Sequence, residues 1–162
     1  MMGIMSLSSS QTRRAFVGTT MAAGATVALA ACGDGSSAAP NNEPSAPPEP
    51  VGEGTVVASL KELAVGTKLA VTAPRTGADG KTKDAGFLLF RPNEKTVLAY
   101  TNICTHQGCA VTIKAPKGED FYCACHGSYF QPSDGKAMAG PARGALERIA
   151  AAIKGQDILL YV

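Results

Sequence analysis

The sequence predicts an all-β domain that occupies its C-terminal two thirds. Short apolar runs recur between turn-forming Gly, Pro and Asn residues, a spacing typical of β-sandwiches and small barrels. The segment that holds them, residues 55–162, has about 108 residues, enough for one small domain with its own core. The runs lie at residues 56–58, 68–71, 87–90, 96–100, 111–113 and 158–162.

Residues 1–32 have the features of an export signal. Arg13 and Arg14 lie in a segment, residues 12–17, that resembles a twin-arginine signal, and residues 15–31 form an uncharged apolar stretch. This stretch is short for a membrane span, which needs about 20 apolar residues. It ends in Leu-Ala-Ala-Cys32, which resembles a bacterial lipoprotein cleavage box with Cys32 as the lipidated residue. The alternative is an uncleaved transmembrane anchor, and both place the domain outside the cytoplasm, on a membrane.

Residues 33–54 form the predicted connection between signal and domain. They consist mainly of Gly, Ser, Pro, Asn, Ala and Glu, with almost no large apolar side chain. Such a segment cannot bury enough apolar surface to offset the entropy of ordering, so we expect a disordered, partly polyproline tether. At roughly 3.1 Å per residue, a fully extended tether would reach about 70 Å from the bilayer.

Two short boxes carry the chemistry. Residues 104–109 read Cys-Thr-His-Gln-Gly-Cys and residues 123–128 read Cys-Ala-Cys-His-Gly-Ser, and together they hold both histidines and four of the five cysteines. Two cysteines and two histidines can hold zinc, but zinc sites usually separate paired cysteines by two to four residues, whereas Cys104 and His106 enclose one. A purely structural alternative, in which the cysteines only form disulfides, would leave it to chance that both histidines lie inside the cysteine boxes. The pairing therefore favours an iron-sulfur site.

The two boxes match the patterns C-x-H-x-G-C and C-x-C-H-G-S of the cluster-binding loops of the Rieske family, which the chain resembles. The resemblance implies one [2Fe-2S] cluster, in which imidazoles replace thiolates on one iron and raise the potential above that of an all-cysteine ferredoxin. It also implies a disulfide between Cys109 and Cys125 that clamps the loops. The implied ligands are Cys104 and Cys123 on one iron, and His106 and His126 on the other.

The same resemblance implies a Rieske-type antiparallel β-sandwich or small barrel, with a cluster-binding subdomain of two loops plus a proline loop. The proline loop would be residues 140–146, where Pro141 stiffens the backbone and Arg143 takes the place of a second proline; an ordinary turn is the alternative. Residues 146–153 have apolar spacing that by itself favours a helix. We instead expect a β-hairpin through residues 154–157, because 149–154 also alternates and 158–162 needs a strand partner.

Hydrogen bonds to the cluster sulfurs set its potential, because they stabilise the added negative charge of the reduced state. The resemblance implies that the hydroxyl of Ser128 donates such a bond to a bridging sulfide. High-potential members carry a tyrosine two residues further on, where this chain has Phe130, and its nearest tyrosine is Tyr129. Ala124 also stands where members of the family commonly have a proline between the two cysteines of the second loop. The residues expected around the cluster are Gly108, Gly127, Ser128, Phe130 and Pro141.

Composition narrows the functional classes. The chain has 15 basic and 13 acidic residues, and loss of Arg13 and Arg14 with the signal leaves 13 of each, which argues against a nucleic-acid partner. A terminal oxygenase needs a further iron held by two histidines and a carboxylate, and no histidine remains. We therefore expect an electron carrier tethered to the outer face of the bacterial cytoplasmic membrane, with protein redox partners. The alternative is the Rieske subunit of a quinol-cytochrome c reductase, whose partners are quinol and a cytochrome.

Overall fold

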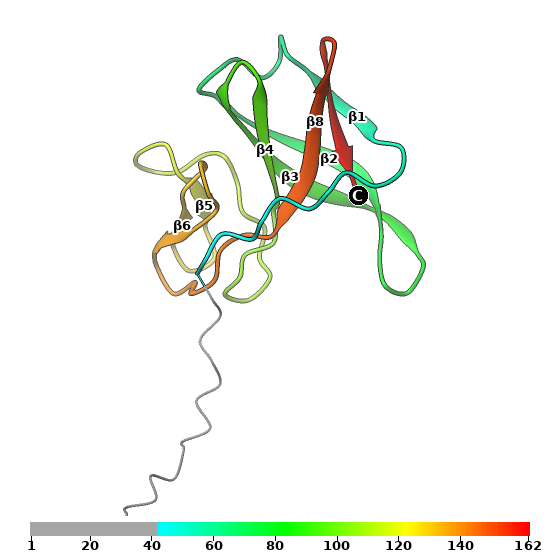
Figure 1. The fold of residues 1–162 in the computed structure, drawn as a ribbon. Coiled ribbons are helices and arrows are strands. Elements are labelled where there is room, and N and C mark those ends of the chain that lie inside the picture. Colours follow the sequence, from blue (N-terminus) through cyan, green and yellow to red (C-terminus); the bar gives the residue numbers. More distant parts are fainter. Residues whose placement is uncertain (1–41) are drawn as a thin grey trace, which may run out of the picture. The chain divides into compact units, whose positions relative to one another are not determined.

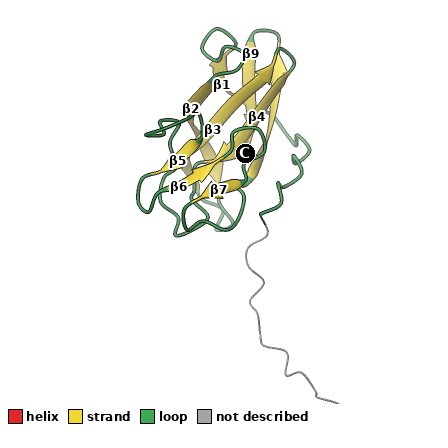
Figure 2. Ribbon diagram, turned by 90° about the vertical axis from the view of Figure 1, so that its left-hand side faces the viewer, coloured by secondary structure: helices red, strands yellow, loops and turns green. Residues whose placement is uncertain are grey.

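The computed structural model describes residues 42–162, so the predicted export signal, with Arg13, Arg14 and Cys32, and the first part of the predicted tether lie outside the described residues. The described part contains nine β-strands and no helix (Figure 2). It accordingly offers no helix that is long and apolar enough to cross a membrane. The prediction of an all-β domain is confirmed.

Six strands form one antiparallel sheet in the order β1-β9-β8-β4-β3-β2 (Figure 1). Contacts between β1 and β2, the two edge strands, bring the sheet close to a closed barrel. The strands are β1 (Thr55–Ser59), β2 (Lys68–Thr76), β3 (Thr82–Asn93), β4 (Thr96–Thr101), β8 (Arg148–Lys154) and β9 (Asp157–Tyr161).

Strand β3 is buried on both faces, which explains its continuous apolar run. Successive side chains of a strand point to opposite faces. Phe87 and Leu89 therefore pack into the core inside the barrel, whereas Leu88 packs into a second core on the other face. Strand β4 divides in the same way, with Ala99 in the first core and Tyr100 in the second.

The second core lies between the large sheet and a small sheet of order β5-β6-β7, seen at one end of the domain in Figure 1. These strands are β5 (Phe121–Cys123), β6 (Ser128–Phe130) and β7 (Ala137–Ala139). Tyr100 joins the two sheets: its ring meets Phe121 edge-on at 5.9 Å, and its hydroxyl donates to the carbonyl of Pro132. Two residues of the expected metal site, Cys104 and Cys123, belong to this core.

Two segments test the details of the strand prediction. The expected hairpin is present, because β8 and β9 pair across a turn in which Gly155 has a φ of 63°, a conformation that favours glycine. The strand expected at residues 111–113 is not formed. Thr112 makes a single bridge to Tyr122 of β5, because the short β5 offers no longer partner.

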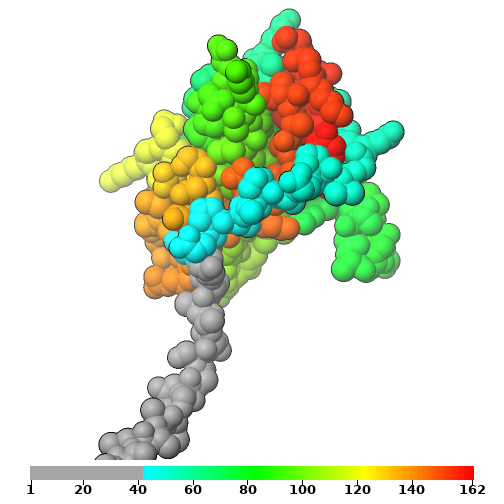
Figure 3. All heavy atoms as spheres, in the orientation of Figure 1, coloured from blue at the N-terminus to red at the C-terminus, as the bar shows by residue number. Residues whose placement is uncertain are grey.

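Residues 42–54 are irregular and cross the surface of the domain before β1 begins (Figure 3). Asn42 exchanges two hydrogen bonds with the backbone of Ala137 in β7, and Ser45 accepts one from the backbone of Arg148 in β8. This end of the predicted tether therefore contacts the domain.

Candidate metal centre

The two cysteine-histidine boxes fold into the same kind of turn. In the first, the backbone N–H of Gly108 donates to the carbonyl of Cys104 at 2.8 Å; in the second, Gly127 donates to Cys123 at 3.1 Å. Both glycines have positive φ, 76° and 73°, which side-chain-bearing residues rarely adopt. Each glycine lies four residues after its cysteine, but the histidine is two residues after the cysteine in the first loop and three residues after it in the second.

The first loop is also fixed at its base. The N–H of Cys104 donates to the carbonyl of Cys109, and Val111 donates to Asn102. A bridge between Ile103 and Ala110 completes this short antiparallel ladder. The second loop is the connection between β5 and β6, which pair from Cys123 and Ser128 outward. Each loop thus extends from a hydrogen-bonded base.

Cys104 and Cys123 form the buried side of the site. Both thiols are free of disulfides, and the two residues are 3% and 1% exposed. Burial raises the pKa of the Cys123 thiol, and a hydrogen bond with the Cys104 thiol raises it further, so the two sulfurs are neighbours. One cysteine from each loop therefore meets the other beneath the turns, where both could bind one iron.

His106 and His126 form the outer side. Their rings lie 4.8 Å apart between centroids, at 86° to each other. His106 is half-buried and His126 is exposed. The site thus has thiols toward the core and imidazoles toward the surface, and these are the two residue types that mixed ligation of a [2Fe-2S] cluster requires.

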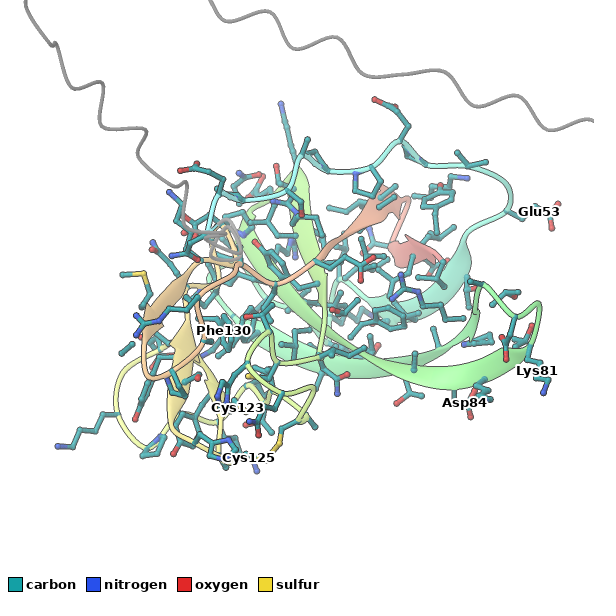
Figure 4. All side chains as sticks on the ribbon, turned by 90° about the horizontal axis from the view of Figure 1, so that it is seen from below. Glu53, Lys81, Asp84, Cys123, Cys125 and Phe130 are labelled. Carbon is teal, nitrogen blue, oxygen red and sulfur yellow. A yellow bond between two sulfur atoms is a disulfide. The ribbon has the colours of Figure 1, made fainter. Side chains whose placement is uncertain are left out.

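A disulfide joins Cys109 to Cys125, as the sequence implied, and links the two loops. Its sulfurs and the sulfur of Cys123 all lie within 4.8 Å of one another. Because the sulfurs of Cys109 and Cys125 are bonded to each other, this trio is not a metal site of its own. The disulfide instead lies against Cys123, an expected ligand, and holds the loops together (Figure 4).

Residues 140–146 pack against both loops. The N–H of Ala142 donates to the hydroxyl oxygen of Ser128 in the second loop, and the hydroxyl of Thr105 in the first loop donates to the carbonyl of Gly144 at 2.6 Å. Gly140 lies so close to the second loop that a Cβ there would meet the carbonyl oxygen of Gly127 at 2.4 Å. Pro141 is half-buried and Arg143 is exposed, so the segment serves as a fixed third loop with a cation at its surface.

The strand alternation in β6 decides which residues face the cluster site. Ser128 and Phe130 are both fully buried, whereas Tyr129 between them is half-buried and points to the opposite face, where its ring contacts Tyr122 at 4.8 Å. Tyr129 therefore does not take the place of the missing hydroxyl at Phe130. Since Ser128 accepts from Ala142, its own hydrogen is available to donate elsewhere.

Two side chains with contacts near the site, Thr105 and Asn42, were not predicted from the sequence. Thr105 lies between two expected ligands, so its hydroxyl could have been noted as a local donor, but its acceptor 39 residues away follows from the fold. The exposed Ala124 lies beside Cys125 at the tip of the second loop. The structure brings together three pairs of the expected residues, one member from each loop: Cys104 with Cys123, His106 with His126, and Cys109 with Cys125.

Comparison with known proteins agrees with this geometry. A sequence model of the family described as "Rieske [2Fe-2S] domain" matches residues 55–150. The cytochrome b6-f complex iron-sulfur subunit of Synechococcus sp. (strain JA-3-3Ab) is 32% identical over 112 residues, covering 66% of this chain and 63% of that protein. The cytochrome bc1 complex Rieske iron-sulfur subunit of Streptomyces lividans is 33% identical over 64 residues, covering 39% and 38%.

A solved structure supports the fold alone. The complex of reduced oxygenase and oxidized ferredoxin in carbazole 1,9a-dioxygenase contains a chain that aligns with a TM-score of 0.51 at 19% identity, covering 67% of this chain and 92% of that one. The chain spans less than two thirds of the length of the curated relatives named above. Its donor set of two buried thiols and two imidazoles fits a [2Fe-2S] cluster of mixed ligation.

Proposed function

Because this chain belongs to the Rieske [2Fe-2S] family and the family's domain binds one [2Fe-2S] cluster, we propose that it is a one-electron carrier tethered outside the cytoplasm. The observation that carries the proposal is the polarity of the site, with buried thiols and outward-facing imidazoles. The cluster supplies a centre that gains and loses one electron. The protein holds it at the surface, where a partner can approach the histidine side.

The proposed ligands divide the work between them. Cys104 and Cys123, which belong to the second core, would hold one iron, and His106 and His126, which lie closer to solvent, would hold the other. The disulfide and the third loop fix both cluster loops, which limits rearrangement when the charge changes. Ser128 is fixed by Ala142 so that its hydroxyl can donate toward the cluster and favour the reduced state.

The proposed location rests on the N-terminal sequence and the disulfide. Arg13 and Arg14 would direct export, and Cys32 would carry the lipid that keeps the protein on the outer face of the bacterial cytoplasmic membrane. A disulfide is typical of proteins outside the reducing cytoplasm. Labelled palmitate should enter the wild type but not Cys32→Ser. Membrane association that persists in Cys32→Ser, without label, would instead favour a transmembrane anchor.

Export is tested separately from lipidation. Replacing Arg13 and Arg14 together by lysine keeps the charge but removes the arginine pair, so the holoprotein should accumulate in the cytoplasm. Fractionation of spheroplasts, together with a protease-accessibility assay, measures how much of the protein is cytoplasmic and how much is on the outer face. A double variant that still reaches the outer face at wild-type levels would refute twin-arginine export.

A second candidate is the iron-sulfur subunit of a quinol-oxidising complex. The names of the b6-f and bc1 relatives favour it. A stable complex with cytochrome b would carry haem, so detergent extracts of native membranes distinguish the two functions. The free-carrier proposal expects the affinity-purified protein to contain iron and inorganic sulfide but no haem, and to exchange one electron reversibly at an electrode. Haem that copurifies in stoichiometric amount would support the complex instead.

A further inference from the structure

The segment before β1, residues 42–54, contacts the domain near both of its ends, while residues 46–53 between them are exposed; we call this segment the strap. At its start, the side-chain amide of Asn42 donates to the carbonyl of Ala137 at 3.0 Å and accepts from the N–H of the same residue at 2.8 Å. The amide thereby imitates a paired strand residue. Since β7 is an edge strand of the small sheet, this contact covers backbone groups that would otherwise face solvent.

The strap is bound at two further points. Ser45 accepts a hydrogen bond at 3.0 Å from the N–H of Arg148, the first residue of β8. At the other end, Gly54 lies directly on β9, because a Cβ there would meet side-chain atoms of Leu159 and Tyr161 at 3.0 Å. Figure 3 shows the strap as the cyan segment that passes across the orange and red strands.

The composition of the strap suits reversible docking. Four of the nine residues 42–50 are proline, which fixes φ and lowers the conformational entropy of the free segment, so docking costs less. Proline also lacks a backbone N–H, so the strap has few amide donors of its own. Two of the three hydrogen bonds accordingly run from domain amides to the side chains of Asn42 and Ser45, and the third is donated by the side chain of Asn42.

The strap enters the domain beside the metal centre. A cavity of about 380 Å³ is lined both by Glu43 and Ser45 of the strap and by Cys104 and Thr105 of the first cluster loop. The chain therefore reaches the domain at β7, at the cluster end, and returns along the surface to β1. If the strap detached, the 13 residues from 42 to 54 would add about 40 Å of extended chain to the tether.

We propose that residues 42–54 dock on β7 and β8 and detach as one unit. The tether then has two states: a short one, in which the strap is docked beside the cluster site, and a long one, in which the strap is detached. The proposal rests on the tethered carrier only for its functional meaning, because the docking is a property of the domain itself. In the short state, the part of the domain that carries the cluster stays next to the point where the tether meets the domain. In the long state, the domain can reach more distant partners.

Hydrogen exchange tests the docking directly, because the amides of Ala137 and Arg148 belong to the domain while their acceptors belong to the strap. The full-length, cluster-loaded protein in detergent would be compared with Asn42→Ala and Ser45→Ala. If the strap detaches as a unit, each substitution should speed exchange at both amides by about threefold or more. Glu49→Gln, a change at an exposed residue of the same segment, is the matched control and should leave both rates unchanged.

Two readouts separate this effect from general destabilisation and from the proposed function. The amide of Gly108, bonded within the first cluster loop, should exchange at the wild-type rate in all variants, and the visible spectrum of the cluster should not change. Neither readout requires a membrane or a redox partner. Exchange that changes only at the amide next to the substitution, or at neither amide, would overturn the proposal of a unitary strap.

Discussion

Removing the disulfide between Cys109 and Cys125 should cost about 3 kcal/mol of stability. The bond closes a loop with a sequence separation of 16, and the chain-entropy relation gives about 3 kcal/mol at 25 °C for a loop of this length. Cys109 is half-buried and Cys125 is exposed, so serine at both positions adds little desolvation cost. For a domain of this size, the loss corresponds to a fall of about 12 °C or more in the unfolding midpoint.

The assay compares the exported wild type with the Cys109→Ser, Cys125→Ser double variant by thermal unfolding. Both are heated at one fixed scan rate, because loss of the cluster makes unfolding irreversible. Cluster absorbance is followed in the same samples, since the bond links the two loops that carry the proposed ligands. With reductant present the two proteins should unfold together. A difference below about 2 °C without reductant would refute the reasoning that the disulfide clamps the loops.

Three further predictions concern the surroundings of the cluster and the second core. Phe130→Tyr should raise the reduction potential by tens of millivolts in protein-film voltammetry, because a hydroxyl donor toward a ligand sulfur favours the reduced state; 59 mV corresponds to about 1.4 kcal/mol for one electron. No response would mean that the added hydroxyl does not reach the cluster. Ser128→Ala should lower the potential by a similar amount in the same assay, and an unchanged value would exclude Ser128 as a donor. Burial raises the pKa of Tyr100 from 10.0 in the unfolded chain to about 12 in the folded protein. The stability that the neutral phenol contributes is therefore fully present below pH 10 and is lost as the pH rises through about 12. Tyr100→Phe should lower the free energy of unfolding by about 1–2 kcal/mol at neutral pH, because the Pro132 carbonyl loses its hydrogen-bond donor. In this variant the unfolding temperature should fall less steeply between pH 10 and 12 than in the wild type. An equally steep fall would contradict the assignment of this pH dependence to Tyr100.

The cluster loops could be predicted because their information is local. In each loop, a cysteine followed four residues later by a glycine of positive φ forms the turn. Strands β3 and β4 could likewise be predicted from their apolar runs, since strands that are buried on both faces need a continuous apolar sequence. The hairpin of β8 and β9 required the added reasoning that the last strand needs a partner, because its apolar spacing alone favoured a helix.

Contacts between distant segments could not be predicted in the same way. Residues 111–113 have the composition of a strand, but strand formation depends on the partner, and β5 is only three residues long. The strap has the composition of a free tether, and its contacts depend on where β7 and β8 leave unpaired amides. Thr105 likewise finds its acceptor in a loop 39 residues away, which no local pattern specifies.

Electron paramagnetic resonance of the dithionite-reduced holoprotein tests the central claim most directly. Ligation by Cys104, His106, Cys123 and His126 predicts one [2Fe-2S] cluster with the low average g-value of nitrogen-ligated iron, and His126→Cys should give a ferredoxin-like spectrum or no cluster. A silent spectrum from wild-type protein that contains one equivalent of zinc by elemental analysis would contradict the account.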